Sequence, residues 1–426
     1  MKNTRTFKIV LTLYGILWSL AIPVLYLFPR IRCGFKERLY KTGSGINANI
    51  WIQAASAGEA YVAIEIIRNL KPEKKTRIHL TSYTSQGLEI LMNAFSKSTC
   101  ELSDNVSITT GFFPFDSPQV IKRAVQSINP EIMILIESEM WPCLMYTLKK
   151  NGSRVFIING RLTEKSFRNY IRLTGFWENI APNKILAISE DDASRFSKLF
   201  KLKKVELLPN IKFDSIINNN ISILNRDLGN IRLHKDNKLL VLASVRKEEE
   251  EQISRIIEKI LLEMPDTVIA LFPRHMHRIK KWQKILTRLN CKWTLKSKTE
   301  TEILPGTVIL WDGFGELASV YSKADAAFVG GSLARLGGQN FIEPISCGII
   351  PVIGPYWDDF SWIGKEIFRN GLAIEGKNWQ ETAESLIRIL RNPEKKTIII
   401  SKALDYFHKK RGGSEIACKV ILEAMQ

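Results

Sequence analysis

A carboxylate stands at the end of an apolar run early in the chain. The segment Ala-Ala-Ser-Ala-Gly-Glu-Ala occupies 54–60, and its small residues, Gly58 among them, allow a tight turn before Glu59 opens a helix. A glutamate at this point can take the proton from an attacking hydroxyl and act as a general base. The position also suits a glutamate that only balances the helix dipole, so the spacing leaves both interpretations open.

Two more glutamates, Glu137 and Glu139, end a strongly apolar run in the segment Ile-Glu-Ser-Glu-Met-Trp-Pro. Because side chains alternate along an extended chain, we expect both on one face unless the following turn redirects one of them. Lys212, in Pro-Asn-Ile-Lys-Phe-Asp, is a cation that could stabilise charge in a transition state. The structural alternatives are an ion pair of Glu137 with Arg161 or Lys212, and an ordinary surface lysine.

The C-terminal half carries cations and glycines at comparable positions. Arg274 ends an apolar run in Phe-Pro-Arg-His, where a guanidinium can meet a phosphate with two hydrogen bonds. His275 and His277 have no third ligand near them in the sequence, so we expect no metal site. Gly315 and Glu316 mark a strand-to-helix turn whose backbone N–H groups could meet a nucleotide.

The most distinctive segment is Phe-Val-Gly-Gly-Ser-Leu-Ala-Arg-Leu-Gly-Gly-Gln-Asn-Phe-Ile-Glu-Pro, residues 328–344. Its two glycine pairs permit close backbone approach to a ligand; they are Gly330, Gly331, Gly337 and Gly338. Asn340 and Glu343 are three residues apart, a spacing that predicts one helical face suited to a ribose and a base. The alternative is a simple helix cap.

Short apolar runs alternate with longer amphipathic ones, which predicts an α/β fold with parallel sheets covered on both faces. The strand candidates are 49–56, 76–83, 131–138, 154–160, 184–189, 238–245, 267–275, 307–313, 326–331 and 349–354. They form two groups, so we expect two doubly wound domains with a cleft between them. Ligands of such sheets bind beyond the carboxyl ends of the strands, where the candidate residues stand.

The length of 426 residues also favours two domains. A polar, asparagine-rich stretch at 218–237 is typical of an interdomain connection. We therefore place an N-terminal membrane anchor at 1–32, a first domain at 33–217, a linker at 218–237 and a second domain at 238–426.

The anchor prediction rests on residues 9–29, which are uncharged and long enough to cross a hydrocarbon core. No small-residue cleavage site follows, which favours a retained segment over a signal peptide. Cations lie on both sides of it, so it could span the membrane or lie in it; they are Lys2, Arg5, Lys8, Arg30, Arg32, Lys36, Arg38 and Lys41. Those that follow could hold the next domain against anionic lipid headgroups.

The chain has 61 Lys and Arg against 43 Asp and Glu, a formal charge of +18 that favours an anionic partner. No zinc spacing, recognition-helix pattern or aromatic-basic strand accompanies this charge, which argues against nucleic acid. Six scattered cysteines without a Cys-x-x-Cys pair suit a reducing cytosol.

Nine motifs together resemble those of one known family, the Kdo (3-deoxy-D-manno-octulosonic acid) transferases of lipopolysaccharide assembly, which have the GT-B fold. In the family's order they are AASAGE, FFPFD (112–116), IESEMWP, INGRLT (158–163), NIKFD, PRH, FGEL, FVGGSL and GGQNFIEP. The resemblance runs from the apolar segment nearly to the C-terminus.

This resemblance implies an inverting, metal-independent transfer of Kdo from CMP-Kdo to a lipid A precursor of the lipid IVA type, with no other cofactor. Glu59 corresponds to the general base, and Glu137 and Lys212 correspond to groups that stabilise the transition state. The residues that correspond to the CMP site are Pro273, Arg274, Phe314, Gly315, Glu316, Asn340, Phe341, Ile342 and Glu343. The resemblance also implies the inner membrane, with both domains on the cytoplasmic side.

Three positions depart from the family pattern. Arg246 stands where a histidine is usual, Leu336 replaces an arginine, and Gln339 replaces a histidine. After Arg246 the family's glycine is missing, and we interpret the acidic run 248–251 as a solvated helix start.

Two other functions remain open. One is a UDP-sugar enzyme of the same fold, either a glycosyltransferase or an epimerase. The other is a non-catalytic membrane protein that binds anionic glycolipid and assembles partners. A rise in melting temperature with CMP but not UDP would separate the first interpretation from both.

Overall fold

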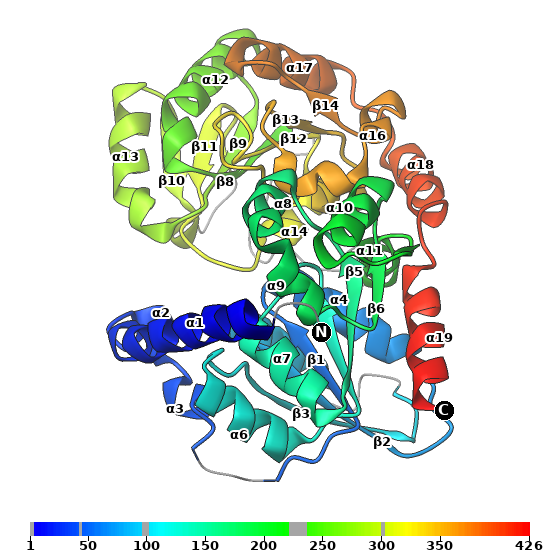
Figure 1. The fold of residues 1–426 in the computed structure, drawn as a ribbon. Helices are drawn as coiled ribbons and strands as arrows, with labels where there is room; N and C mark the ends of the chain where they lie inside the picture. Colours follow the sequence, from blue (N-terminus) through cyan, green and yellow to red (C-terminus); the bar gives the residue numbers. More distant parts are fainter. Residues whose placement is uncertain (1–3, 42–44, 96–101, 221–236, 300–302) are drawn as a thin grey trace. The chain divides into compact units, whose positions relative to one another are not determined.

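The computed structural model describes residues 4–41, 45–95, 102–220, 237–299 and 303–426. The chain divides into two compact units (Figure 1). Unit 1 comprises Met1–Ser215 and Lys410–Gln426, and unit 2 comprises Ile216–Lys409.

Unit 1 is built on a parallel sheet whose described strands number seven. In spatial order they are β3 (Val106–Phe112), β2 (Thr76–Ser82), β1 (Ile50–Ala54), β4 (Ile132–Ile136), β5 (Arg154–Gly160), β6 (Lys184–Ala187) and β7 (Glu206–Leu207). Its helices are α1 (Thr4–Leu25), α2 (Pro29–Arg32), α3 (Phe35–Arg38), α4 (Ala57–Asn69), α5 (Ser85–Phe95), α6 (Pro118–Ile128), α7 (Pro142–Asn151), α8 (Glu164–Tyr170), η1 (Ile171–Leu173), α9 (Thr174–Asn179), α10 (Glu190–Phe200) and α19 (Gly413–Met425). Helix α11 (Lys212–Asn220) begins in unit 1 and continues into unit 2.

Successive side chains of this sheet point to opposite faces and pack into two separate cores. In β4, Met133 and Leu135 belong to a core with α6, α7, α9 and α10, whereas Ile132, Ile134 and Ile136 belong to a core with α4, α5 and α19. All five residues of β4 are buried, as expected for a central strand covered by helices on both faces. The predicted α/β doubly wound architecture is therefore confirmed for unit 1.

Unit 2 repeats this plan, again with seven strands in its described residues. In spatial order they are β10 (Lys292–Leu295), β11 (Thr307–Leu310), β9 (Val268–Pro273), β8 (Leu239–Val245), β12 (Ala326–Val329), β13 (Pro351–Ile353) and β14 (Ile374–Glu375). Its helices are η2 (Lys247–Glu249), α12 (Glu250–Glu263), η3 (Met276–Arg278), α13 (Ile279–Arg288), η4 (Lys296–Lys298), α14 (Leu317–Lys323), α15 (Ile342–Ser346), η5 (Asp358–Ile363), α16 (Glu366–Arg369), α17 (Trp379–Arg391) and α18 (Lys396–His408). Helices α12, α13 and α17 cover one face of the sheet, and α14 covers the other.

The predicted boundaries differ from these units at two places. Helix α19 belongs to unit 1 and not to the second domain, because its apolar side is buried in a core with α4. Helix α11 runs through the predicted first boundary at 217, and of the predicted linker 218–237, residues 221–236 lie outside the described residues.

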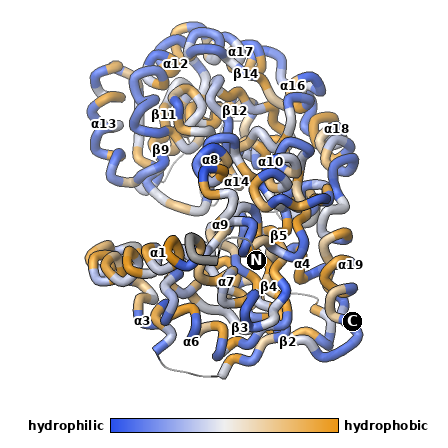
Figure 2. Tube along the Cα trace, in the orientation of Figure 1, coloured by the Kyte–Doolittle hydropathy of each residue, from blue (hydrophilic) through white to orange (hydrophobic). Residues whose placement is uncertain are grey.

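Helix α1 packs on unit 1 against α7 and α9. Residues Phe7–Leu25 are long and apolar enough to cross a membrane by length and composition. Figure 2 shows α1 as mainly hydrophobic, whereas α12 and α13 of unit 2 alternate between hydrophilic and hydrophobic residues. Arg38, expected among the lipid-facing cations, is instead buried, and its guanidinium donates to the Tyr83 carbonyl at 2.7 Å.

Candidate active site

Glu59 lies in the first turn of α4, directly beyond the carboxyl end of β1. Ser56 is the N-cap residue of this helix, and its hydroxyl donates to Glu59 Oε1 at 2.9 Å. The backbone N–H of Ala55 donates to Glu59 Oε2 at 2.7 Å. These two bonds fix the carboxylate at the turn between strand and helix, so a helix-capping role and a chemical role coincide in this side chain.

The carboxyl group of Glu59 is a much weaker acid than an ordinary glutamate side chain. Burial, together with the negative charges of Glu139 and Glu137, raises its pKa to about 8, and the bonds from Ala55 and Ser56 oppose part of this rise. A carboxyl group with a pKa near the operating pH is suited to accept a proton during a reaction. The geometry therefore fits the general base predicted from the sequence.

Glu137 and Lys212 form an ion pair, with 2.5 Å between Nζ and Oε1. The two side chains are only 15% and 20% exposed. Glu137 has a positive φ of 60°, which is a costly backbone conformation for a non-glycine residue, and its N–H donates to the Ile158 carbonyl at 3.0 Å. The strained turn holds Glu137 at the carboxyl end of β4, where it meets Lys212.

Two buried asparagines fix the loop that carries Lys212. Asn159, at the end of β5, donates from Nδ2 to Asn210 Oδ1 at 3.1 Å and accepts the N–H of Ile211 at 2.9 Å. Asn210 in turn accepts the N–H of Lys212 at 3.0 Å. Asn159 also has a positive φ, of 59°. Neighbouring strands β4 and β5 thus end in two strained residues that together position the ion pair.

The same loop is joined to the start of α19. The carboxylate of Asp214 accepts the N–H groups of Gly412 and Ser414, each at 2.7 Å. A side chain at position 413 would collide with the Pro209 carbonyl, because an added Cβ would lie 2.0 Å from that oxygen. The C-terminal helix therefore fits closely against the Lys212 loop and supports it.

Glu139 takes a different set of partners from Glu137. The indole N–H of Trp141 donates to Glu139 Oε2 at 2.8 Å, and the Trp141 ring stacks on Tyr83 at a centroid distance of 5.8 Å. Burial raises the pKa of Glu139, and the charge of Glu137 adds to this effect. The turn after β4 therefore redirects the two glutamates, and both leave negative charge beside Glu59.

Asp116, from the Phe-Phe-Pro-Phe-Asp motif, binds the start of the helix that follows this turn. Its buried carboxylate accepts the N–H groups of Cys143 and Leu144 at 3.1 and 2.8 Å, in the first turn of α7. It also accepts the hydroxyl of Tyr14 in α1 at 2.9 Å. Burial raises the pKa of Asp116 to about 7. The motif thus joins α1 to the segment that follows Glu139 and Trp141.

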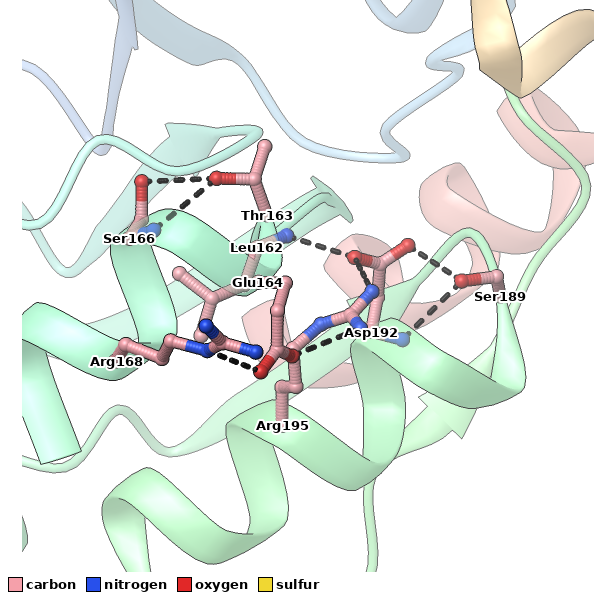
Figure 3. Close-up of polar contacts among 8 residues, drawn as sticks. All are labelled: Leu162, Thr163, Glu164, Ser166, Arg168, Ser189, Asp192 and Arg195. Atoms are coloured by element: carbon pink, nitrogen blue, oxygen red, sulfur yellow. Dashed lines mark hydrogen bonds and ion pairs between the residues drawn. The ribbon is translucent and has the colours of Figure 1, made fainter. Parts of the chain in front are cut away.

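The Ile-Asn-Gly-Arg-Leu-Thr loop after β5 is held by α10 (Figure 3). Asp192 accepts the N–H of Leu162 at 2.8 Å, and Arg195 lies between Asp192 and Glu164 at 3.3 and 3.7 Å. The hydroxyl of Thr163 caps α8 by accepting the N–H of Ser166. The contacts of Leu162 and Thr163 therefore fix the backbone between β5 and α8.

In unit 2, the ends of β8 and β9 bring several cations together. Arg274 is exposed, and its backbone N–H donates to the Val245 carbonyl at 2.8 Å, one residue before Arg246. Desolvation and the positive charges of Arg246, His277 and Arg274 lower the pKa of His275. This edge can meet an anion, and the buried Pro273 ends β9 directly before the exposed Arg274.

The turn beyond β11 combines a fixed carboxylate with an exposed aromatic ring. Glu316 accepts Lys296 Nζ at 2.7 Å and the Trp311 indole N–H at 2.8 Å. Phe314 is 79% exposed, and Gly315 has a φ of 85° that favours glycine. The turn holds its backbone through Glu316 and leaves the Phe314 ring at the surface.

The first glycine pair has a structural function that the sequence did not reveal. The N–H groups of Gly331, Ser332 and Leu333 donate to Glu249 at 2.7 to 2.9 Å, and Glu249 is fully buried. Glu250 is buried as well and pairs with Arg278 at 2.6 Å. The prediction that the acidic run 248–251 is solvated is therefore wrong for Glu249 and Glu250, because backbone amides and an arginine satisfy their carboxylates.

The second glycine pair precedes a shorter helix than predicted. Helix α15 begins at Ile342, so Asn340 and Glu343 do not share a helical face, and that prediction is wrong. The exposed Asn340 instead precedes the N-cap residue Phe341 and accepts the N–H of Ile342 at 3.2 Å. Phe341 and Ile342 are buried, and the Phe341 ring packs against Trp357. These two residues can offer a ligand only their backbone.

Within the described part of the chain, no group of three or more His, Cys, Asp or Glu residues is arranged to hold a metal ion. The rings of His275 and His277 stack at a centroid distance of 5.5 Å.

Comparison with known proteins decides the family. A family profile described as 3-deoxy-D-manno-octulosonic-acid transferase (kdotransferase) matches residues 32–215. The 3-deoxy-D-manno-octulosonic acid transferase of Rickettsia conorii is 32% identical over 347 residues, covering 80% of this chain and 72% of the relative. The chain belongs to the Kdo transferase family. It is therefore a glycosyltransferase.

Solved structures add the fold of this Kdo transferase. UDP-GlcNAc 2-epimerase from Neisseria meningitidis matches with a TM-score of 0.56 at 13% identity, covering 88% of this chain and 99% of the epimerase. That likeness shows the shared GT-B fold. The C-terminal CMP-Kdo binding domain of WaaA from Acinetobacter baumannii is 26% identical, covering 45% of this chain and 98% of that domain, with a TM-score of 0.37.

The three residues that differ from the usual Kdo transferase pattern lie in loops of unit 2. Arg335, one position before Leu336, is exposed, and its guanidinium lies 5.6 Å from the Tyr356 ring centroid. Gln339 donates to the Gly338 carbonyl at 3.0 Å. Arg246 joins the cations at the ends of β8 and β9.

Several supporting residues of this Kdo transferase were not found by sequence reasoning about single sites. Asn159, Asp116 and Asp214 all lie inside quoted motifs, so the motifs located them without revealing their partners. The sequence does not distinguish Glu249, because it is one of four consecutive glutamates and nothing in the sequence marks it as buried. Its proximity to three consecutive backbone amides is visible only in the fold.

Proposed function

We propose that this enzyme transfers Kdo from CMP-Kdo to a lipid A precursor of the lipid IVA type, with inversion at the anomeric carbon. Family membership supports the sugar. The observation that carries the mechanism is Glu59, a carboxylate fixed at a strand end with a pKa raised to about 8.

In the proposed reaction, Glu59 takes the proton of the acceptor hydroxyl as the hydroxyl oxygen bonds to the anomeric carbon of Kdo. The bond from that carbon to the CMP phosphate breaks, and CMP leaves with the electron pair. One base on the face opposite the leaving group is sufficient for inversion. The paired Glu137 and Lys212 supply fixed charges near the reacting groups, and a fixed charge stabilises a transition state without reorganising.

Unit 2 is the proposed donor-binding unit. Arg274 and the cations beside it would receive the CMP phosphate, and the turn Phe314 to Glu316 and the segment Asn340 to Glu343 would hold the nucleoside. The support is the gathering of cations at β8 and β9 and the exposure of Arg274, Phe314 and Asn340. We propose that these protein cations meet the charge of the leaving group and that no divalent ion is needed.

Unit 1 is the proposed acceptor-binding unit, held at the cytoplasmic side of the inner membrane by the N-terminal segment. The support is the apolar stretch Phe7–Leu25, attached to the unit that carries Glu59. A lipid acceptor stays in the bilayer, so an enzyme at that surface meets it without extracting it.

The test is transfer by purified protein from CMP-Kdo, generated in the reaction, onto tetra-acylated lipid A precursor, with products read by mass. A gain of one or more Kdo masses is expected, and excess EDTA should leave the rate unchanged. CMP should raise the melting temperature more than UDP does. No mass gain from folded protein, together with stabilisation by UDP alone, would contradict the proposal.

A further inference from the structure

Helix α1 is apolar on both of its sides. One side, with Phe7, Val10, Leu11 and Tyr14, packs into the core of unit 1. The other side presents a row of large apolar residues, each between 51% and 68% exposed: Ile9, Leu13, Ile16, Leu17, Leu20 and Val24. A helix that is apolar all round is normally buried all round. The protein covers only one side of α1, and the second side lacks an apolar environment.

The covered side is fixed along the length of the helix. Near the N-terminal end the Phe7 ring stacks on Phe176 at 5.1 Å. In the middle, the Tyr14 hydroxyl binds the buried Asp116 carboxylate, and Trp18 contacts Phe115 at a centroid distance of 6.0 Å. These contacts place α1 flat along the side of unit 1.

This placement is incompatible with a helix that spans the bilayer. At 1.5 Å per residue, the 22 residues of α1 extend about 33 Å, which is enough to cross a core of about 30 Å. However, the groups bound to the middle of α1 would then lie at the bilayer midplane, including the loop of Asp116. Irregular backbone in contact with hydrocarbon leaves polar groups without partners, so spanning would require α1 to leave its docking site.

The charges around the exposed row indicate what covers it. Lys8 is exposed beside the start of the row, and Arg32, Lys36 and Lys41 are exposed beyond its end. Glu37 is the single acidic residue in the sequence from 4 to 41. An apolar row with cations at both ends matches the boundary between acyl chains and anionic headgroups.

We propose that α1 lies in the plane of the membrane, with the row from Ile9 to Val24 in the headgroup and acyl boundary and the flanking cations on anionic headgroups. Its two ends then lie on the same side of the bilayer. The inference rests on the proposed function only for the presence of a membrane, because its test reads topology and not transfer.

The docking of α1 also places the membrane surface close to the candidate catalytic edge. Asp116, which holds Tyr14 of α1, holds the N–H groups of Cys143 and Leu144 as well. Only Pro142 separates Cys143 from Trp141, whose indole N–H donates to Glu139. The carboxylate of Asp116 therefore contacts both α1 and the start of α7, next to the turn that carries Glu139. A lipid acceptor would meet this edge of the sheet at the bilayer surface.

Cysteine accessibility tests the topology directly. Cys33 is a natural exposed cysteine beyond the C-terminal end of α1, and Lys8→Cys places a second one near the N-terminal end. Inside-out inner-membrane vesicles containing the Lys8→Cys variant are treated with a membrane-impermeant maleimide, and labels are located by peptide mass spectrometry. We expect both positions to be labelled in these vesicles and neither in right-side-out spheroplasts. Labelling of position 8 only in spheroplasts would overturn the proposal.

The lipid as occupant is tested with a matched pair of variants. Leu17→Gln with Leu20→Gln makes the exposed row polar, and Leu262→Gln changes an 84% exposed leucine in unit 2. We expect the double variant to lose most cosedimentation with phosphatidylglycerol-containing vesicles, while its melting temperature and its activity on detergent-dispersed acceptor match those of the Leu262→Gln control. Unchanged cosedimentation would overturn the proposal, as would a change from dimer to monomer with vesicle binding retained, since the row would then contact a second copy.

Discussion

The candidate residues at the strand ends differ between the two units in their burial and in their partners. In unit 1, Glu137 and Lys212 are mostly buried, paired with each other and set by strained backbone. In unit 2, Arg274 and Asn340 are exposed, and the buried carboxylate of Glu249 binds the protein's own backbone.

This difference matches the proposed division between preorganised chemistry in unit 1 and nucleotide binding in unit 2. Charges that must act in a transition state gain most when they are fixed and shielded from water before the substrate arrives. A site that must admit and release a nucleotide gains from exposed groups on a firm backbone. The two edges share a strand-and-loop architecture, and we infer that burial, not the motif alone, assigns their tasks.

The largest predicted effect is at Glu59. Glu59→Gln should lower kcat by about 10²–10⁴-fold, because the amide cannot accept the proton. The fold should survive, since glutamine can take the same capping position. Wild type loses stability as pH rises from about 4.5 to about 8, because the folded carboxyl group binds its proton more tightly than the unfolded one. The variant should therefore match or exceed the wild-type melting temperature at pH 8; full activity in a folded variant would remove Glu59 from the mechanism.

The next effect is at the ion pair. Lys212→Met should lower kcat by about 10²-fold and destabilise the fold by about 1–3 kcal/mol, because Glu137 is left mostly buried and unpaired. Glu137→Gln together with Lys212→Met should cost much less than the sum of the single changes, in stability and in rate. Chemical denaturation and steady-state kinetics on the four proteins give the coupling. Additive losses would show that the pair does not act as a unit.

Unit 2 should respond in the reverse manner. Arg274→Ala should raise KM for CMP-Kdo by about tenfold with little change in melting temperature, since the side chain is exposed. Glu249→Ala removes the acceptor of several buried N–H groups and should destabilise the fold by about 3 kcal/mol or more. Donor titrations and thermal melts on both variants make the comparison. A strong loss of stability from Arg274→Ala would contradict the division between exposed binding and buried support.

The smallest effect is expected at Glu139. Its charge raises the pKa of Glu59, so Glu139→Gln should move the acidic limb of the kcat/KM profile to lower pH. The maximum rate should change little, because Glu139 acts through Glu59. A limb that stays in place, or moves to higher pH, would show that the two carboxyl groups are not coupled.

The sequence predicted the sheets best where strands are central. The apolar run of β4 is buried on both faces and was placed correctly, whereas β3, β7, β10 and β14 were not predicted. These lie at or near sheet edges, and β7 and β14 have only two residues each. β10 is largely half-buried and begins with an exposed lysine, so no continuous apolar signal marks it.

The sequence identified the candidate residues of the site but not the side chains and backbone groups that they contact. The motifs located Glu59, Glu137 and Lys212, yet the ion pair forms because the parallel strands from β4 to β7 end at the same edge of the sheet, which brings 137 beside 212. Glu249 shows the limit most clearly. Glu248 and Glu251 of the same acidic run are exposed, whereas Glu249 is buried because the Gly331 loop approaches it and donates backbone N–H groups to its carboxylate.

Glu59 is proposed to act as a base beside two other carboxylates, and the pH dependence of kcat/KM for wild-type transfer tests this role most directly. A carboxyl group must be ionised to accept a proton, and the pKa of Glu59 is raised to about 8. We therefore predict that kcat/KM rises by about tenfold per pH unit below that value and levels above it. A profile that is flat from about pH 6 to about pH 9, or one that falls through this range, would contradict the assignment of Glu59 as the base.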